Sequence, residues 1–354
     1  MQDQTRLPVQ GVTAYPASAA SARVRVASYI PFLHARGIAL RHLPTLSAAE
    51  YALLLSAASP ARKAAALARS AVRAAAIRER GGLLLVHRLL LLTPFPGIDP
   101  PRRLDIYDFD DALTVGSAAA VNRRFQWTKQ EARRAAACMR RARLVLAANG
   151  TLAAQAREHA SRVEVVPSCV DPDEQPLHQH TDAETVTIGW MGSHTTVTYL
   201  EPFLPVIRRL NERGRRIRLV VVGGDTGVRA EWIEHRPWSL ETQASDLASF
   251  DIGVMPLPDN QWTRGKAGYK LLQYFSAAVP AVASPVGVNA ELVADGRGIA
   301  AVTAVDWEQA LSELISDATA RRERGAAARS FVEHHYSYQR WAPELARLIR
   351  SLTA

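Results

Sequence analysis

Cysteine is nearly absent from this sequence of 354 residues, which contains only Cys138 and Cys169 and no C-x-x-C pair. A disulfide framework or a cysteine-bound structural zinc is therefore not expected, and a reducing cytoplasm is the predicted location. Long apolar runs are also missing. The longest, 83–92, is interrupted by His87-Arg88 and is too short to span a bilayer. The polar start of the chain lacks the apolar core of a secretory signal.

Acidic residues are outnumbered. With 43 Lys and Arg against 34 Asp and Glu, the formal net charge is +9. A basic chain suits an anionic small ligand, an anionic membrane surface or nucleic acid, but a general richness in arginine and alanine explains the charge equally well. No motif interleaves aromatic and basic residues as nucleic-acid-binding domains do, so nucleic acid is not an expected partner. Hydrophobic residues make up 48%, enough for two buried cores.

The first half of the chain alternates predicted strands with predicted helices, which is typical of a Rossmann-like domain. The apolar patterns predict strands at 38–43, 83–87, 103–107, 144–148 and 163–166, and helices at 24–35, 48–55, 61–80, 129–141 and 151–160.

Four arginines of the predicted helix 61–80 fall on one face at 3.6 residues per turn: Arg62, Arg69, Arg73 and Arg80. Such a stripe favours either an ordinary solvated face, the commoner case, or a peripheral contact with an anionic membrane. Both interpretations stay open.

Residues 171–184 are polar, contain two prolines and lack periodicity, so they are the predicted linker between domains at 1–170 and 185–340. His178 and His180 lie in this linker. An H-x-H pair can bind a metal, but a mobile linker without ordered carboxylates makes that interpretation weak, and no metal site is predicted.

The second half begins with a predicted strand at 186–191, followed by the small-residue turn 192–196 and a helix toward Asn211. Free N–H groups at a helix N-terminus favour an anion there. The turn lacks G-x-G-x-x-G, so a dinucleotide is not indicated. Further strands are predicted at 218–222, 251–255 and 280–284, and helices at 242–249, 270–278, 307–318, 320–334 and 341–352.

The stretch 251–291 carries the most information. An apolar strand breaks at Pro256-Leu257-Pro258, a loop with glycines and basic residues follows, and a short helix leads to a second apolar strand. Open α/β sheets bind ligands at the carboxyl ends of their strands. Glycines let backbone N–H groups approach oxygen atoms, and Arg264 and Lys266 can neutralise phosphate, so a phosphorylated sugar is the predicted ligand.

This stretch, together with the G-W-x-G-S run from Gly189 and the Y-D-F-D-D-A run from Tyr107, resembles retaining glycosyltransferases of family 4. The resemblance covers most of the chain. It implies a GT-B fold, in which two Rossmann-like α/β domains with parallel sheets face a central cleft. The first domain would bind the acceptor, with the helix at 341–354 packing back on it, and the second would bind the donor.

The implied reaction moves a sugar, with retention, from a nucleotide-diphosphate sugar to a specialised metabolite or surface glycan. A UDP-sugar is favoured, and no metal is required if lysine and a helix N-terminus carry the phosphate charge. The implied donor-binding residues are Gly192, Ser193, Arg264, Lys266, Lys270, Gln273, Val286, Gly287, Asn289 and Glu291. The implied acceptor-binding residues are Arg23, Arg25, Arg88 and Asp110, and the implied catalytic residues are Asp108, Asp111, His87 and Lys266.

Several of these residues have a structural alternative. Arg23 and Arg25 are equally explained as solvated arginines, His87 as a buried or capping residue, and Lys270 as a helix-surface residue. Asp108 stands where many relatives have a catalytic histidine.

The sequence also departs from the family pattern of two glutamates eight positions apart, where it has Gly265 and Gln273. The Gln273 amide can still hydrogen-bond a ribose hydroxyl, but Gly265 cannot stabilise positive charge on a sugar ring. Two alternatives therefore stay open: a non-catalytic GT-B protein that binds a nucleotide sugar or a partner enzyme, and another GT-B enzyme such as a sugar-nucleotide epimerase.

Overall fold

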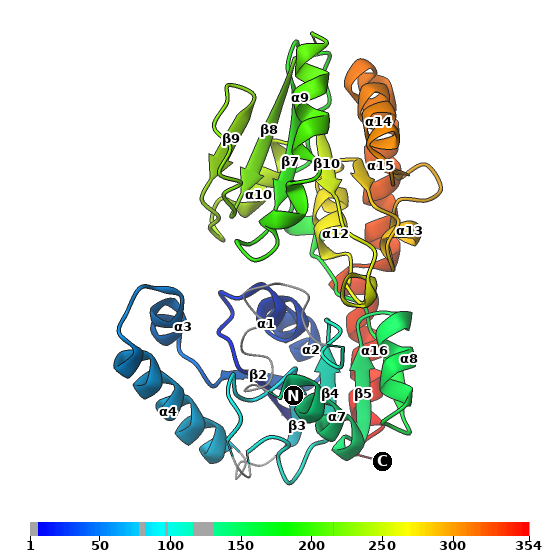
Figure 1. Ribbon diagram of the computed structural model, residues 1–354. Coiled ribbons are helices and arrows are strands. Elements are labelled where there is room, and N and C mark those ends of the chain that lie inside the picture. Colours follow the sequence, from blue (N-terminus) through cyan, green and yellow to red (C-terminus); the bar gives the residue numbers. More distant parts are fainter. Residues whose placement is uncertain (1–5, 78–81, 96–97, 116–129, 215, 354) are drawn as a thin grey trace. The chain divides into compact units, whose positions relative to one another are not determined.

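The structure, a computed structural model, describes residues 6–77, 82–95, 98–115, 130–214 and 216–353 (Figure 1). It divides the chain into two compact units. The N-terminal unit is Met1–Cys169 with Tyr338–Ala354, and the C-terminal unit is Val170–Ser337. Each unit contains a six-stranded sheet in which every pair of neighbouring strands is parallel. The predicted α/β class with two parallel-sheet, Rossmann-like domains is confirmed.

The sheet of the N-terminal unit has the order β2-β1-β3-β4-β5-β6. Its strands are β1 Leu7–Thr13, β2 Ile38–Pro44, β3 Leu83–His87, β4 Ile106–Phe109, β5 Leu144–Ala147 and β6 Val163–Val165. The helices are α1 Ala20–Arg25, η1 Ala27–Tyr29, α2 Ile30–His34, α3 Ala48–Leu55, α4 Pro60–Ile77, α7 Glu131–Arg141, α8 Gly150–Arg157 and α16 Tyr338–Arg350.

Two local predictions for this unit were wrong. β1 was missed because Gln10 and Gly11 interrupt its apolar pattern, yet it is an inner strand between β2 and β3. A Cβ on Gly11 would lie 2.5 Å from Val26 Cγ1, so only glycine lets the segment after α1 pack this closely on β1. The predicted single helix 24–35 is divided into α1, η1 and α2, with Pro31 in the first turn of α2.

Helix α16 buries its apolar face in the core of the N-terminal unit. Leu345 and Ile349 contribute to that core, and the Tyr338 hydroxyl donates a hydrogen bond to the carbonyl oxygen of Val24 at 3.1 Å. The Tyr338 ring also packs edge-on against Tyr29, with 4.8 Å between ring centres. The last helix of the chain therefore completes the first unit, and it begins at Tyr338 rather than at the predicted position 341.

The sheet of the C-terminal unit has the order β12-β11-β10-β7-β8-β9. Its strands are β7 Val186–Met191, β8 Ile217–Val222, β9 Ile233–Arg236, β10 Ile252–Met255, β11 Ala281–Ala283 and β12 Gly298–Ala300. The helices are η2 Pro172–Glu174, η3 Val197–Leu200, α9 Leu204–Glu212, α10 Gln243–Ala248, α11 Gln261–Arg264, α12 Tyr269–Ser276, α13 Asn289–Leu292, α14 Ala304–Ser316 and α15 Ala318–His335.

Differences from the sequence prediction concentrate at the edges of this sheet and after β7. The edge strands β9 and β12 were missed because they are short and only partly buried. The turn 192–196 does not lead directly into an α-helix. It leads into η3, a single 3₁₀ turn, and α9 begins only afterwards, with Pro205 in its first turn. The helix toward Asn211 is thus divided, as its prolines Pro202 and Pro205 lead one to expect, and the N–H groups that directly follow the turn belong to η3.

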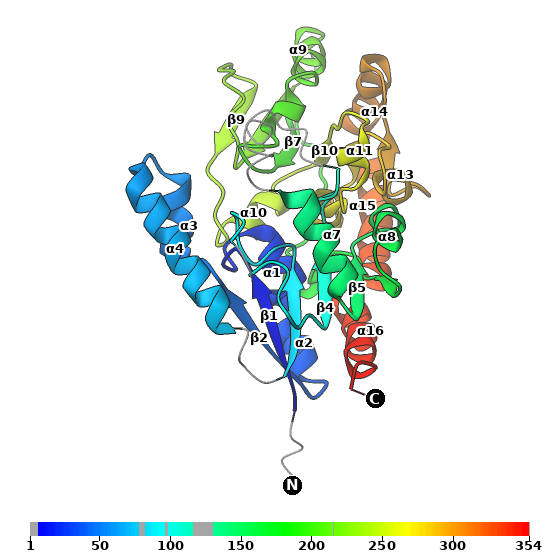
Figure 2. The same ribbon diagram turned by 60° about the horizontal axis from the view of Figure 1, so that its bottom comes forward.

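The arginine stripe is partly tied to the protein itself. Helices α3 and α4 lie side by side in both views (Figures 1 and 2). Arg69 Nε lies 2.7 Å from Glu50 Oε1, and Arg73 binds the other oxygen of the same carboxylate. Arg62 is exposed, and Arg80 lies outside the described residues. In the part of the chain that the structure describes, no helix combines the length and apolar character needed to cross a membrane.

We expect Glu50→Gln to lower the free energy of unfolding by about 1–2 kcal/mol at pH 7, because it removes the charge that Arg69 and Arg73 share. Burial opposes the charged form of Glu50, but hydrogen bonds from Ser47, Arg69 and Arg73 outweigh it and lower the pKa to about 2. Since this value lies below the unfolded one, the stabilisation is complete above about pH 4.5 and is lost as the pH falls toward 2.

Urea unfolding of wild type and Glu50→Gln at pH 7 and pH 3 measures this effect. The difference between the two proteins should shrink at pH 3, and a difference that stays constant would contradict the ion pair. Arg62→Gln is the control, because this arginine is exposed on the same helix and its loss should change stability by less than about 0.5 kcal/mol.

Candidate functional site

Each sheet has one point at which the strand order reverses. In the C-terminal unit the chain passes from β7 through β8 to β9 on one side and then crosses to β10 on the other side of β7. In the N-terminal unit the reversal falls between β1 and β3. Loops that leave two such strands diverge, and open α/β sheets bind ligands in the crevice they form. The candidate ligand-binding positions are therefore the carboxyl ends of β7 and β10 in one sheet and of β1 and β3 in the other.

At the reversal point of the C-terminal unit, the structure brings together Gly192 and Lys270. Gly192 follows β7, and Lys270 lies in the first turn of α12, which comes after β10 and α11. A Cβ on Gly192 would lie 2.9 Å from Lys270 Nζ and would collide with the ring of Trp190. The same ammonium lies over that ring, 5.0 Å from its centre. The lysine charge therefore lies beside backbone that a residue larger than glycine would cover. A positive charge next to uncovered backbone suits a phosphate group.

An open cavity of about 470 Å³ continues the site along the ends of β7, β8 and β9. The cavity adjoins the turn that begins at Gly192, because its lining residue Gly223 packs so closely on this turn that a Cβ would collide with the carbonyl oxygen of Gly192. The Trp238 indole N–H donates to Gln243 Oε1 at 3.2 Å, which fixes one edge of the ring. The cavity is lined by His194, Gly223, Gly224, Asp225, His235, Arg236, Pro237 and Trp238.

The sequence indicated only one residue of this cavity, His194, as part of the turn 192–196 that was predicted to favour an anion. The glycine pair after β8 was visible as a strand end, but Arg236 and Trp238 follow β9, which was not predicted. The available signal was the glycine pair Gly223-Gly224 directly after a predicted strand, because open α/β sheets bind ligands at the carboxyl ends of their strands.

The predicted residues between Arg264 and Glu291 form a neighbouring group around two loops. A Cβ on Gly287 would collide with the carbonyl oxygen of Arg264, and a Cβ on Gly268 would lie 3.3 Å from Asn289 Oδ1. The Asn289 side chain is buried, and its Oδ1 has no hydrogen-bond partner. The loops at 264–268 and 287–289 therefore pack on each other without room for larger side chains.

The Arg264 guanidinium forms two hydrogen bonds with Asp259 on the surface of the loop, at 2.6 and 2.9 Å, and both side chains are exposed. Lys266 Nζ lies 5.5 Å from the centre of the Trp262 ring.

The other predicted donor-binding residues differ in exposure. Gln273 is 7% exposed and Val286 is also buried, whereas Ser193 and Glu291 are exposed. Gly265, which stands where the resembled family has glutamate, ends α11 in the buried part of this loop.

At the reversal point of the N-terminal unit, three buried side chains form one hydrogen-bonded group. His87 Nδ1 lies 2.7 Å from Asp108 Oδ1, and Arg25 donates to both oxygens of the same carboxylate. Arg25 also donates to the carbonyl oxygen of Val166 at 2.7 Å. Burial opposes the charged form of Asp108, but Arg25 and His87 outweigh it and lower the pKa of that carboxyl.

The burial of this group excludes one of the two interpretations of Arg25. Arg25 is 4% exposed, so it is not a solvated arginine, and it donates hydrogen bonds to Asp108 and to the carbonyl oxygen of Val166. Asp108 is also buried, and its hydrogen bond to Nδ1 orients the ring of His87. Arg23 donates to the carbonyl oxygens of Ala17 and Ser18, at 3.1 and 3.3 Å, and so shapes the loop before α1.

The second ring nitrogen of His87 faces the next acidic residue. Because His87 Nδ1–H donates to Asp108, Nε2 carries the lone pair of the neutral ring. It has no hydrogen-bond partner and lies 3.7 Å from Asp110 Oδ1. Arg88 donates to Asp110 at 2.6 Å and pairs with Asp111, and it holds these two carboxylates at the partly exposed end of the group.

Two further polar residues lie at this edge and were missed from the sequence. Thr13, the last residue of β1, pairs in register with His87, and its hydroxyl lies 2.8 Å from His42 Nε2. Thr13 was overlooked together with β1, whereas His42 lies in the predicted strand 38–43 and was given no role there.

Comparisons with known proteins agree with this architecture. Residues 185–318 match the sequence model of a family described as Glycosyl transferases group 1. No curated protein matches the chain.

Solved structures similar to the chain include a sucrose-phosphate synthase from Thermosynechococcus elongatus, with a TM-score of 0.75 and 13% identity over 98% of this chain and 99% of that chain. WaaG, a glycosyltransferase involved in lipopolysaccharide biosynthesis, has a TM-score of 0.63 and 15% identity over 96% of this chain and 99% of that chain. Anabaena Alr3699/HepE in complex with UDP and glucose has a TM-score of 0.67 and 12% identity over 98% of this chain and 100% of that chain.

The two six-stranded parallel sheets and these neighbours identify the fold as GT-B. The family match lies within the C-terminal unit and contains Gly192, Trp238, Lys270 and the loop at 287–289. Fold and family match together support sugar transfer.

Proposed function

We propose that this protein is a glycosyltransferase that binds a nucleotide-diphosphate sugar, most favourably a UDP-sugar, in its C-terminal unit. The observation that carries the proposal is the placement of Lys270 Nζ beside Gly192 at the reversal point of the sheet, next to the cavity that contains Trp238. Lysine charge and open backbone suit a diphosphate, and a fixed indole suits a nucleobase. Bound UDP in the Alr3699/HepE structure and the family match in this unit add support.

In the proposed reaction, the bond between C1 of the sugar and the diphosphate oxygen breaks, and an acceptor oxygen bonds to C1. The acceptor proton passes to the departing phosphate or to solvent. Charge develops on the diphosphate, so Lys270, with Lys266 from the neighbouring loop, lowers the barrier by stabilising the leaving group. We propose retention of configuration because of the family resemblance. Gly265 adds no support, because it has no side chain that could contact the sugar ring.

We propose that the N-terminal unit binds the acceptor, either a specialised metabolite or a glycan. The cluster of Arg88, Asp110 and Asp111 supports this role, because its two carboxylates are partly exposed and can accept hydrogen bonds from acceptor hydroxyls or amines, with His87 buried beside them. Asp108 orients His87 through the hydrogen bond to Nδ1, and Arg25 holds Asp108 in place. Both are therefore proposed as positioning residues.

Release of nucleoside diphosphate from UDP-, GDP-, TDP- and ADP-sugars, with and without a mixture of candidate acceptors, tests the proposal. We expect one donor to be consumed, slowly with water alone and faster with an acceptor. NMR of the product then gives the anomeric configuration. Binding without any turnover would favour a non-catalytic nucleotide-sugar-binding protein, and conversion of the donor to an epimer without release would favour an epimerase.

Asp111→Asn is expected to separate acceptor binding from donor binding. Loss of the carboxylate charge removes a charged hydrogen-bond acceptor worth about 1.5–3 kcal/mol, so kcat/KM for the acceptor should fall about 10- to 100-fold. The Kd for UDP should stay within about twofold, because Asp111 belongs to the N-terminal unit. An equal loss of UDP affinity would contradict this division of roles.

A further inference from the structure

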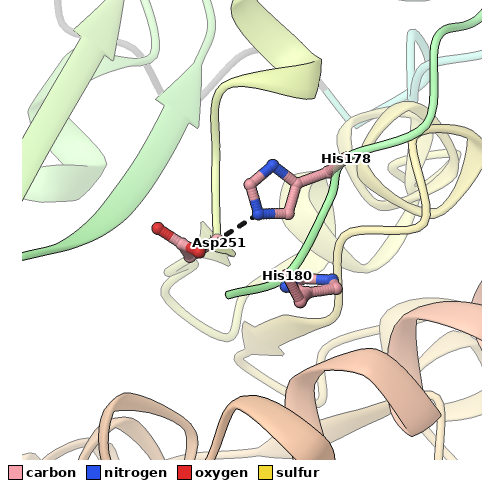
Figure 3. Close-up of side chains that lie close together, drawn as sticks. All are labelled: His178, His180 and Asp251. Carbon is pink, nitrogen blue, oxygen red and sulfur yellow. Dashed lines mark hydrogen bonds and ion pairs between the residues drawn. The ribbon is translucent and has the colours of Figure 1, made fainter. Parts of the chain in front are cut away.

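A second polar cluster lies at the opposite edge of the C-terminal sheet, where β10 begins. Asp251 directly precedes β10, and His178 and His180 come from the segment between η2 and β7. Figure 3 shows the two rings and the carboxylate converging from these two segments. One ligand atom from each of the three residues lies within 4.8 Å of the other two. The segment predicted as a mobile linker is therefore held against β10, with His180 only 8% exposed.

Backbone carbonyl groups fix the tautomer of both histidines. His178 Nδ1 lies 2.8 Å from the carbonyl oxygen of Ala248, and His180 Nε2 lies 2.9 Å from that of Ala278. A carbonyl oxygen only accepts, so both of these nitrogens carry hydrogen. In the neutral rings, the lone pairs therefore belong to His178 Nε2 and His180 Nδ1. Histidine ligands of metals are commonly oriented in this way, with the second nitrogen donating to a carbonyl.

Both lone pairs lack a satisfactory partner within the protein. His180 Nδ1 is buried and has no hydrogen-bond partner. His178 Nε2 lies 3.1 Å from Asp251 Oδ1, so in the neutral ring a lone pair faces a carboxylate. Either a proton on His178 or a cation between the two atoms removes this repulsion. A proton on His178 would leave His180 Nδ1 unsatisfied, whereas one metal ion can satisfy both nitrogens.

The closest pair of ligand atoms has a spacing that suits a divalent metal, and the His180 nitrogen lies within 4.8 Å of both. Two ligand atoms at about 2.0–2.1 Å from one zinc ion lie about 2.9–3.4 Å apart at bond angles between 90° and tetrahedral. The 3.1 Å between His178 Nε2 and Asp251 Oδ1 falls in this range. The other Asp251 oxygen accepts from the Thr187 N–H at 2.8 Å, which holds the carboxylate in place.

We propose that His178, His180 and Asp251 form a binding site for a zinc-like divalent cation. The ion would hold the segment between η2 and β7 against the start of β10. Two imidazoles and one carboxylate are ligands that zinc accepts, with water in the fourth position. The ion would act structurally, because the cluster lies at the amino ends of the strands and the proposed donor site lies at their carboxyl ends.

Arg321 sets a limit on the affinity. Its Nε lies 3.8 Å from Asp251 Oδ1, and its terminal nitrogens donate to the carbonyl oxygens of Leu314 and Thr181, each at 2.7 Å. This buried positive charge weakens the attraction of Asp251 for a second cation. We therefore expect a Kd on the order of 1 μM rather than the far tighter binding of structural sites with four protein ligands.

The test uses the full chain without an affinity tag, stripped of metal with a chelator and then equilibrated with Zn²⁺. Elemental analysis after equilibrium dialysis against free Zn²⁺ about tenfold above this Kd should give about one zinc per chain more than in the dialysis buffer, and Co²⁺ should give visible absorption bands of a low-symmetry site. His180→Gln should reduce the zinc content at least tenfold. His334→Gln/His335→Gln is the matched control, since it removes an adjacent pair of exposed histidines from α15 and should leave the zinc content unchanged.

Asp251→Asn is the second variant, because its amide oxygen can still accept from Thr187 while the charged ligand is lost. We expect it to weaken zinc binding and to keep the circular dichroism spectrum of wild type. Zinc should raise the Tm of wild type and not that of either variant. Wild type without zinc above background, or zinc that remains in His180→Gln and disappears in the exposed-pair variant, would overturn the proposal.

Discussion

Asp108→Ala is expected to destabilise the N-terminal unit by about 3–5 kcal/mol, the largest stability effect predicted for any single substitution in this protein. Asp108 and Arg25 are both buried, and the carboxylate is the anion that balances the guanidinium. Its loss leaves Arg25 charged in the core and also removes the acceptor for His87 Nδ1. Unfolding by urea, followed by circular dichroism, measures the effect.

The double variant Arg25→Met/Asp108→Leu is the control, because it removes both charges and fills the space with apolar side chains. Replacing a buried ion pair in this way is often neutral or stabilising, so the double variant should recover most of the stability lost in Asp108→Ala. Wild-type stability in Asp108→Ala would show that the buried pair is not formed. The same experiment guards against misreading lost activity in Asp108→Ala as a chemical role for this residue.

Lys270→Met is expected to weaken UDP binding about 10- to 100-fold, because a charged hydrogen bond to phosphate contributes about 1.5–3 kcal/mol. The substitution keeps an unbranched chain of similar length over Trp190, so the packing of α12 on β7 should survive. Isothermal titration with UDP measures the change, and Lys63→Met on α4 makes the same charge change in the other unit as a control.

Gly192→Ala provides independent support for the same site. Its methyl group would meet Lys270 Nζ and the Trp190 ring, so it should displace the ammonium and weaken UDP in the same direction. Equal UDP affinity in wild type, Lys270→Met and Gly192→Ala would place the diphosphate elsewhere.

The stretch 251–291 was largely predictable, because its signals are local. An apolar strand, a proline break and a helical period specify β10, α12 and β11 within a few residues of their observed bounds. The same holds for the class of fold, which follows from the alternation of strands and helices. β1 was not predictable in this way, since Gln10 and Gly11 fit a polar segment and only their inner position in the sheet explains their burial.

The sites themselves depend on pairs that are far apart in the sequence. Arg25 and Asp108 are separated by 83 positions, and His178 and Asp251 by 73. An arginine in a small-residue segment predicts a solvated surface, because nothing local indicates that a carboxylate will meet it in the core. Gly192 and Lys270 were each assigned to the donor site, but their closeness follows from β7 and β10 being neighbours, which the order of elements along the chain does not state.

The central claim, that the C-terminal unit binds a nucleotide diphosphate carrying a sugar, is tested most directly by thermal unfolding of the wild-type chain with UDP-, GDP-, TDP- and ADP-sugars. Ligand that binds the native state raises the Tm by an amount set by its concentration relative to Kd. We predict that one nucleotide, most favourably UDP, raises the Tm, and that the matching nucleoside monophosphate raises it less. No shift with any nucleotide at millimolar concentration would contradict donor binding in this unit.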